Sequence, residues 1–431
     1  MSRIRLPVRN GQGIVQAWAQ KEDEPMLPDI DFDLSEEERN LRDLVHRFAA
    51  EVMRPAGQAL DRRSAEEVIA RDSVLWEVHK KWDEIGVRML TGGESAFAPA
   101  QLARLNCIVT EELGWGDAGL AISLGAAEFP AMLAQTSQNP DLMSAFPVNK
   151  LGCWAITEPD HGSDSLDLSD SSKRPGLVKP NCVARRDGDY YVVTGQKAAW
   201  VSNGPVAETA ALYTAVDNGD GVTGCGVLLV DLTAPGVSRG KPLEKLGQRP
   251  LPQGEVFFDD VRVPAMHMVI PPEMYALGME LTLCTANGFM GSTFVGCARA
   301  ALEMALEYAK QRVQGGVPII QHQAIKMKLF EMFRKVEAAR SLNRRVVLYN
   351  IVSNPLFGAA PGSFPAVQYA IASKVTSTQT AFEVASEALQ IFGGNGLSYE
   401  YPIEKLLRDA RASLIEDGTN EVLALHAADK L

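Results

Sequence analysis

Asp417 is the side chain of this 431-residue sequence whose setting best suits acid–base chemistry. It stands directly before Gly418 and Thr419, between a charged helical run and an apolar one. Because glycine adopts backbone conformations that strain other residues, a turn here can direct the carboxylate inward and free nearby N–H groups for a ligand oxygen. A buried, directed carboxylate is what proton abstraction requires. The pattern alone does not identify an enzyme, since most Asp-Gly pairs are ordinary turns.

A second motif, from Trp154 to Asp164, reads Trp-Ala-Ile-Thr-Glu-Pro-Asp-His-Gly-Ser-Asp. Together with the tail it resembles the acyl-CoA dehydrogenases, FAD-dependent enzymes that desaturate acyl thioesters. The family's first motif is similar to aromatic-x-x-Thr-Glu-Pro-x-x-Gly-Ser-Asp. Its later motifs match three further segments here, in the expected order: Gly393–Gly396, Tyr401–Ala410 and Asp417–Thr419. The resemblance covers roughly Asp33 to the C-terminus.

The resemblance implies that Asp417 is the base. Thioester desaturation removes a proton beside the carbonyl and a hydride from the next carbon, so it requires a base, an oxyanion stabiliser and a flat redox ring. Many relatives carry glutamate where Asp417 stands, one methylene longer, and others place the base near Ala286-Asn287, where this chain has no carboxylate. By resemblance, the Asp417 N–H helps to bind the thioester oxygen, and Ser163 and Gly418 contact the substrate.

The resemblance also implies a flavin clamp. It assigns FAD contacts to the following residues: Trp154, Thr157, Gly162, Ser163, Trp200, Ser202 and Thr419. Hydroxyl groups can bond the edge of the ring, and a glycine permits close approach of the backbone. Taken singly, Trp154 and Trp200 would be ordinary strand core residues.

Four further cofactor residues are implied to serve the flavin of a neighbouring subunit: Arg312, Gln323, Gly393 and Gly394. A guanidinium suits a pyrophosphate through charge-assisted hydrogen bonds. The alternative for Arg312 is a cation at a helix C-terminus. Split cofactor contacts predict a homo-oligomer, a dimer or a tetramer, with an electron-transfer flavoprotein as the electron acceptor.

Two departures from the residue pattern of the family leave other functions open: the aspartate at the base position and the residues on the coenzyme A side. Cys284 and Asn287 stand where many relatives carry an acid and an arginine on the coenzyme A side. Nitroalkane oxidases resemble this family and carry aspartate at the base position, so a nitroalkane-oxidase-like enzyme is one alternative. A non-oxidative acyl-CoA lyase on the same fold is another, and a flavin-holding or nucleic-acid-associated scaffold without turnover is a third.

Composition narrows the classes of partner. The net charge of −12 disfavours a nucleic-acid partner, which needs a dense basic face. The sequence contains no apolar run of roughly eighteen residues, so a membrane partner is not expected. Six scattered cysteines without a Cys-x-x-Cys pair predict reduced thiols in the cytoplasm and no metal site.

The pattern of the sequence predicts an α+β multidomain fold: an extension at 1–32, a helical domain at 33–150, a central β-barrel or sandwich at 151–271, and a C-terminal four-helix bundle at 272–431. The extension is expected to be flexible or to contact a neighbour rather than to be a cleaved transit peptide. Ser35 and Glu38 form a capping box, and Leu166–Pro180 reads as an irregular excursion.

Helices are expected at Ser73–Ile85, Ala98–Gly114, Phe294–Arg312, Gln323–Ile351, Phe364–Ile391 and Glu421–Ala428. Strands are expected at Tyr190–Thr194, Ala210–Val216, Gly226–Asp231 and Glu255–Phe258.

Overall fold

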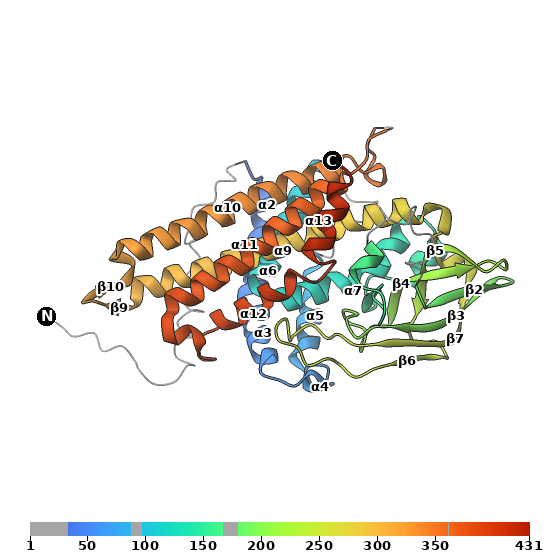
Figure 1. Ribbon diagram of the computed structural model, residues 1–431, viewed down its shortest axis with the longest axis horizontal. Helices are drawn as coiled ribbons and strands as arrows, with labels where there is room; N and C mark the ends of the chain where they lie inside the picture. Colours follow the sequence, from blue (N-terminus) through green and yellow to red (C-terminus); the bar gives the residue numbers. More distant parts are fainter. Residues whose placement is uncertain (1–32, 88–96, 167–179, 361) are drawn as a thin grey trace.

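The computed structural model describes residues 33–87, 97–166, 180–360 and 362–431. The predicted extension at 1–32 and nearly all of the predicted excursion at Leu166–Pro180 lie outside these residues. Helices come first, a sheet follows, and helices return, as the sequence pattern predicts. The sheet forms one end of the molecule, and long C-terminal helices extend away from it (Figure 1).

The first unit is helical. Its elements are α2 (Glu36–Phe48), a π-helix (Ala49–Met53), α3 (Arg54–Asp61), α4 (Ala65–Val68), α5 (Val74–Ile85), α6 (Pro99–Gly116), α7 (Ala118–Thr136) and α8 (Pro140–Ala145). The predicted capping box is confirmed: Ser35 Oγ accepts from the Glu38 N–H, and the Glu38 carboxylate accepts from the Ser35 N–H. Asp117 caps α7 by accepting from the Leu120 N–H at 2.9 Å.

The middle unit is an eight-stranded sheet whose main path runs β6-β7-β3-β2-β4-β5-β8, with β1 paired to β4. The strands are β1 (Gly152–Ala155), β2 (Val183–Asp187), β3 (Tyr190–Lys197), β4 (Thr209–Asp217), β5 (Val222–Asp231), β6 (Val237–Arg239), β7 (Val256–Pro264) and β8 (Met268–Ile270). Each of the four predicted strands is present. β4 is buried along nearly its whole length, and its sequence is mostly apolar, with Thr209 and Thr214 as the buried polar exceptions.

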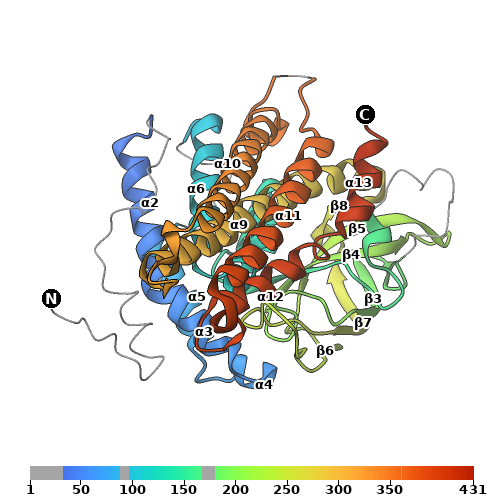
Figure 2. The same cartoon turned by 60° about the vertical axis from the view of Figure 1, so that its left-hand side comes forward.

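The C-terminal unit is built on the long helices α9, α10 and α11, which lie side by side (Figure 2). Its helices are α9 (Tyr275–Gln311), α10 (Gln323–Val352), α11 (Val367–Phe392), α12 (Ile403–Ser413) and α13 (Asn420–Ala428). A short hairpin of β9 (Val313–Gln314) and β10 (Val317–Pro318) joins α9 to α10 at the end remote from the sheet (Figure 1). No helix among the described residues has the length and hydropathy needed to cross a bilayer.

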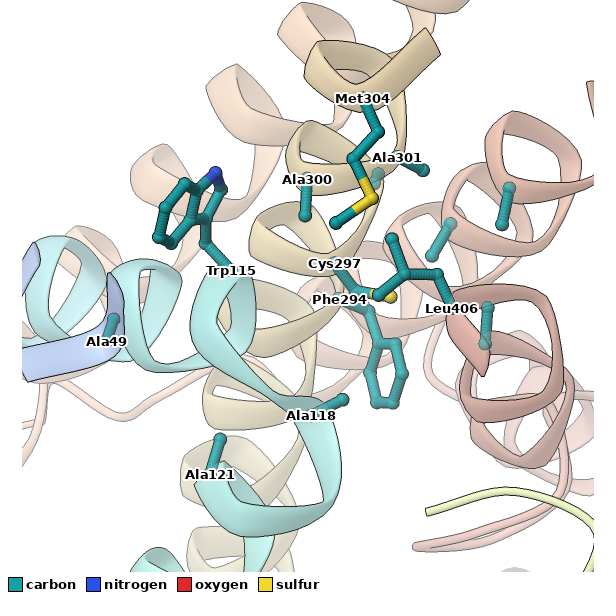
Figure 3. Packing of buried hydrophobic residues seen from close by; sticks show 14 of the residues in the cluster. Ala49, Trp115, Ala118, Ala121, Phe294, Cys297, Ala300, Ala301, Met304 and Leu406 are labelled. Carbon is teal, nitrogen blue, oxygen red and sulfur yellow. The ribbon is translucent and has the colours of Figure 1, made fainter. Parts of the chain in front are cut away.

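The helical run predicted at Phe294–Arg312, within the bundle predicted at 272–431, is too short, because α9 begins at Tyr275. Glycines lower helix propensity in the early part of α9, but packing against α6 overrides it. A Cβ on Gly114 would lie 2.0 Å from the Thr293 carbonyl oxygen, and a Cβ on Gly296 would lie 2.0 Å from the Glu111 carbonyl oxygen. Glycine therefore lets the two helices cross in close contact, beside the apolar cluster in Figure 3.

Candidate active site at the turn between α12 and α13

The turn that carries Asp417 has an unusual backbone. Asp417 adopts φ +52° and Gly418 adopts φ +92°. A non-glycine residue with positive φ is uncommon, and such strain tends to occur at functional sites. A Cβ on Gly418 would also lie 2.8 Å from Leu166 Cδ1. The position after Asp417 therefore requires glycine for both conformation and space.

Two hydrogen bonds from distant parts of the chain hold this turn. The Thr419 N–H donates to Ser163 Oγ at 3.0 Å, which joins the tail to the Trp154–Asp164 motif. The Lys374 ammonium of α11 donates to the Gly418 carbonyl oxygen at 2.9 Å. Thr419 also caps α13 by accepting from the Val422 N–H. The structure thus brings the two sequence motifs together at one point.

The contact from Ser163 gives a first prediction. The variant S163A removes the acceptor of a half-buried N–H, so we expect it to lower the free energy of unfolding by about 1 kcal/mol. Urea denaturation measures the change. Ser165 contributes its backbone N–H to the Gly162 carbonyl, and S165A keeps that bond. Equal losses in S163A and S165A would show that the Thr419 contact contributes nothing to stability.

Electrostatics at the turn favour a carboxylate of intermediate basicity. Burial raises the pKa of the Asp417 carboxyl to about 6, against the opposing effect of the Lys374 ammonium. Burial likewise raises the pKa of Glu416 to about 7. The Glu416 carboxylate accepts a hydrogen bond from the Gln248 side chain at 2.5 Å. Asp417 is therefore ionised at neutral pH, and its pKa is close enough to neutrality for proton transfer.

One of the predicted flavin residues, Trp200, carries an exposed indole. Trp200 is 58% exposed, which is unusual for so large an apolar side chain. The Gln253 side-chain amide donates to the Trp200 carbonyl oxygen at 3.1 Å and to Ser202 Oγ at 3.3 Å. The Ala198 N–H donates to the Thr157 carbonyl oxygen at 2.8 Å, so the segment after β1 lies against the segment after β3. Trp200 offers the flat apolar face that a tricyclic ring would cover.

Gly162 and Trp154 complete the predicted clamp in different ways. Among the described residues other than its two chain neighbours, no heavy atom lies within 4 Å of a Cβ built on Gly162, so that part of the structure leaves space beside its backbone. Trp154 is half-buried, with its ring centroid 5.4 Å from that of Phe129 and 6.1 Å from that of Tyr213. The chemistry of these residues suits an aromatic redox cofactor: an exposed indole, hydroxyl groups and a glycine with space beside its backbone.

The other four predicted cofactor residues do not join Asp417 within one chain. Arg312, Gln323, Gly393 and Gly394 are all exposed. They belong to the β9–β10 end of the bundle and the adjacent end of α11, remote from the sheet (Figure 1). A complete site that includes them would need a second copy of the chain.

Two residues at the turn were missed by sequence reasoning. Lys374 is fully buried, and so are Ile371 and Ala381 on the same face of α11. Their spacing of three and seven residues from Lys374 is the signal that could have identified a buried lysine. Gln248 had no such local signal, because its contact with Glu416 spans 168 residues.

Glu158 of the first motif has a different setting. Its carboxylate accepts from Lys197 Nζ at 2.6 Å, and both side chains are essentially inaccessible to solvent. The Cys182 N–H donates to the same carboxylate at 3.1 Å. The pair joins the loop after β1 to β2 and β3. Within the described ranges, no group of three or more His, Cys, Asp or Glu side chains could hold a metal ion.

The chain is similar to known proteins along most of its length. Models of the N-terminal, middle and C-terminal domains of acyl-CoA dehydrogenases match residues 35–137, 153–261 and 287–431. The chain is 30% identical over 413 residues to benzylmalonyl-CoA dehydrogenase of Aromatoleum aromaticum, covering 93% of this chain and 100% of the relative. It is 32% identical over 324 residues to the short-chain specific acyl-CoA dehydrogenase of Megasphaera elsdenii, covering 73% and 78%. The solved butyryl-CoA dehydrogenase of Megasphaera elsdenii superposes with a TM-score of 0.77 at 27% identity, covering 93% of this chain and 99% of that one.

Proposed function

This chain belongs to the acyl-CoA dehydrogenase family, whose members are FAD-dependent oxidoreductases that act on CH–CH bonds, and we propose that Asp417 is its proton-abstracting base. In this proposal the substrate is an acyl-CoA thioester and the reaction introduces a double bond between its α and β carbons. The observation that carries the proposal is the Asp417 turn. A carboxylate with a raised pKa is held there on a backbone of positive φ, and the Thr419 N–H of the same turn donates to Ser163 of the other motif.

The residues around the turn have separate roles. Asp417 takes the α proton, and its backbone N–H stabilises the thioester oxygen. Gly418 and Ser163 position the acyl group. FAD, when bound, supplies the acceptor for the hydride. Its binding set on this chain comprises Trp154, Thr157, Gly162, Ser163, Trp200, Ser202 and Thr419.

The remaining cofactor contacts are proposed to come from a partner subunit. Arg312, Gln323, Gly393 and Gly394 would reach the flavin of a second copy, which makes the protein a homodimer or a homotetramer. The exposed apolar surface of α10 supports this assembly, since Met327 is 70% exposed and Phe330 61% exposed. An electron-transfer flavoprotein is the proposed acceptor, and the cytoplasm is the proposed location. We also propose that the domains divide at 33–150, 151–271 and 272–431.

The pKa of Asp417 sets the expected pH dependence. As the pH falls through about 6, Asp417 becomes protonated and can no longer accept the α proton. We therefore expect kcat/KM to be constant well above pH 6 and to fall about tenfold for each pH unit well below it. A pH profile of kcat/KM with a soluble electron acceptor tests this. A profile that stays level down to pH 4.5 would contradict the assignment.

A nitroalkane-oxidase-like reaction is the second candidate, favoured by the aspartate base and by Asn287. The Asn287 side chain is fully buried and donates to the Leu283 carbonyl within α9, so it does not replace an arginine that reaches coenzyme A. Anaerobic mixing of the yellow protein with a panel of acyl-CoA thioesters and nitroalkanes separates the two. We expect acyl-CoA thioesters to bleach the flavin. Bleaching by nitroalkanes alone, with rapid oxygen consumption in air, would support the second candidate.

A further inference from the structure

Lys374 is a buried cation placed directly behind the Asp417 turn. Its side chain has no exposed surface. Lysine is almost never fully buried unless it is paired. Its ammonium donates to the Gly418 carbonyl oxygen and to Asn420 Oδ1, each at 2.9 Å. Asn420 is itself held by Thr378 of α11, to whose hydroxyl it donates at 3.1 Å.

The Gly418 carbonyl and the Asn420 amide are neutral acceptors, so the charge of Lys374 must be balanced through space. The carboxylates that act on it are Asp417, Glu416 and Glu421, in order of decreasing effect. The first two lie in the turn and the third at the start of α13, which also carries the buried His426. On the side of α10, the neutral Asn343 side chain donates a hydrogen bond from its Nδ2 to Oγ of the neighbouring Ser373 at 3.1 Å. The carboxylates that balance the charge of Lys374 therefore lie in the turn and at the start of α13.

We propose that Lys374 is a positioning residue with two tasks: it fixes the turn through the Gly418 carbonyl, and it keeps Asp417 ionised against the effect of burial. The inference rests on the proposed function of Asp417. Its physical basis is that desolvation disfavours the carboxylate, whereas a fixed cation in the same low-dielectric environment favours it. The same two effects appear in Lys374, whose pKa burial lowers to about 8 while Asp417 opposes the change.

The two tasks can be separated by variants. K374Q removes the charge and keeps a donor for the Gly418 carbonyl. N420A keeps the charge and removes one hydrogen bond of the ammonium. K374R keeps the charge on a longer side chain. We expect K374Q to raise the pKa of Asp417 by more than one unit, which reduces its ionised fraction more than tenfold at acidic pH. N420A and K374R are expected to change that pKa little.

The direct test is an infrared pH titration of the Asp417 carboxylate band in the holoenzyme, with the band assigned by subtraction of the D417N spectrum. A pKa in K374Q equal to that of the wild type would overturn the inference, as would an equal rise in N420A. If K374Q does not fold, K374R and N420A still decide: a raised pKa in both, with the charge retained, would contradict the electrostatic role.

This measurement does not depend on catalysis, so it distinguishes two failures. A raised pKa in K374Q together with full activity of D417N would refute Asp417 as the base and leave the Lys374 effect intact. An unchanged pKa together with an inactive D417N would do the reverse. The pH profile of kcat/KM provides a second readout, because the acid limb of K374Q should move to higher pH and its activity should recover at alkaline pH.

Discussion

Replacement of Asp417 by asparagine is expected to lower kcat by about 10³-fold while FAD remains bound. Asparagine is nearly the same size and tolerates positive φ, so the turn should keep its shape. It cannot accept the α proton, and loss of a general base typically costs 10²- to 10⁴-fold. Steady-state turnover and the absorbance ratio of flavin to protein measure the two quantities. E416Q is the matched control, since it removes the adjacent carboxylate and leaves the base in place.

The same variant should change stability in a way that depends on pH. The folded pKa of Asp417 is about 6, above its ordinary value of 3.8, so the folded state binds the proton more tightly than the unfolded state does. The stabilisation linked to that proton is complete below the unfolded pKa and is lost as the pH rises through the folded pKa. D417N should therefore gain stability relative to the wild type above pH 6. Full turnover in D417N would reject Asp417 as the base, whatever its stability.

The second large effect is expected at Lys405, where K405M should lower the free energy of unfolding by about 3–5 kcal/mol. Lys405 Nζ lies 2.6 Å from Asp117 Oδ2 and 2.5 Å from Asp409 Oδ2, and all three side chains are buried. Methionine would fill a similar volume but leave two buried carboxylates without their shared cation. Asp117 caps α7, and Leu406 beside Lys405 packs toward α9 in Figure 3, so the loss should affect both helical units.

Guanidinium denaturation followed by circular dichroism measures the loss in K405M. The control is K430M, which removes the surface ion pair between Lys430 and Glu280. Exposed pairs typically contribute less than about 1 kcal/mol. Equal midpoints for K405M and K430M would show that the buried charges rearrange or are solvated, contrary to the role assigned to Lys405.

Local features of the fold were predictable because short-range rules decide them. The capping box of Ser35 and Glu38 depends on residues three positions apart, and the strand at Tyr190 follows directly from a turn at Gly188. The part of α9 before Phe294 was not predictable in this way. It depends on contact with α6, through Gly114 and Gly296, and no pattern within α9 reveals its partner.

The same distinction applies to the candidate site: residue types could be interpreted from the sequence, whereas contacts between distant residues could not. The residue types at Asp417 and Ser163 suggested chemistry. The Asp417 turn is joined to Ser163 by a hydrogen bond from Thr419, 256 positions away in the sequence. Only the family resemblance implied that these two segments lie together. Lys374 could have been identified as buried from the periodicity of α11. Its contact with Gly418 could not, because it depends on how α11 packs against the turn. The placement of Arg312 beside a flavin depends on a second chain and remains a prediction.

The most direct test of Asp417 as the base isolates proton transfer from hydride transfer. Holoenzyme whose flavin has been chemically reduced cannot accept a hydride, yet a base at the α carbon can still exchange α hydrogens of a bound acyl-CoA thioester with deuterium from D₂O. The α-deuterium content of the recovered thioester, determined by mass spectrometry, reports this step alone. We expect exchange with the wild type and E416Q and none above background with D417N. Exchange by D417N at the wild-type rate would show that another group removes the proton.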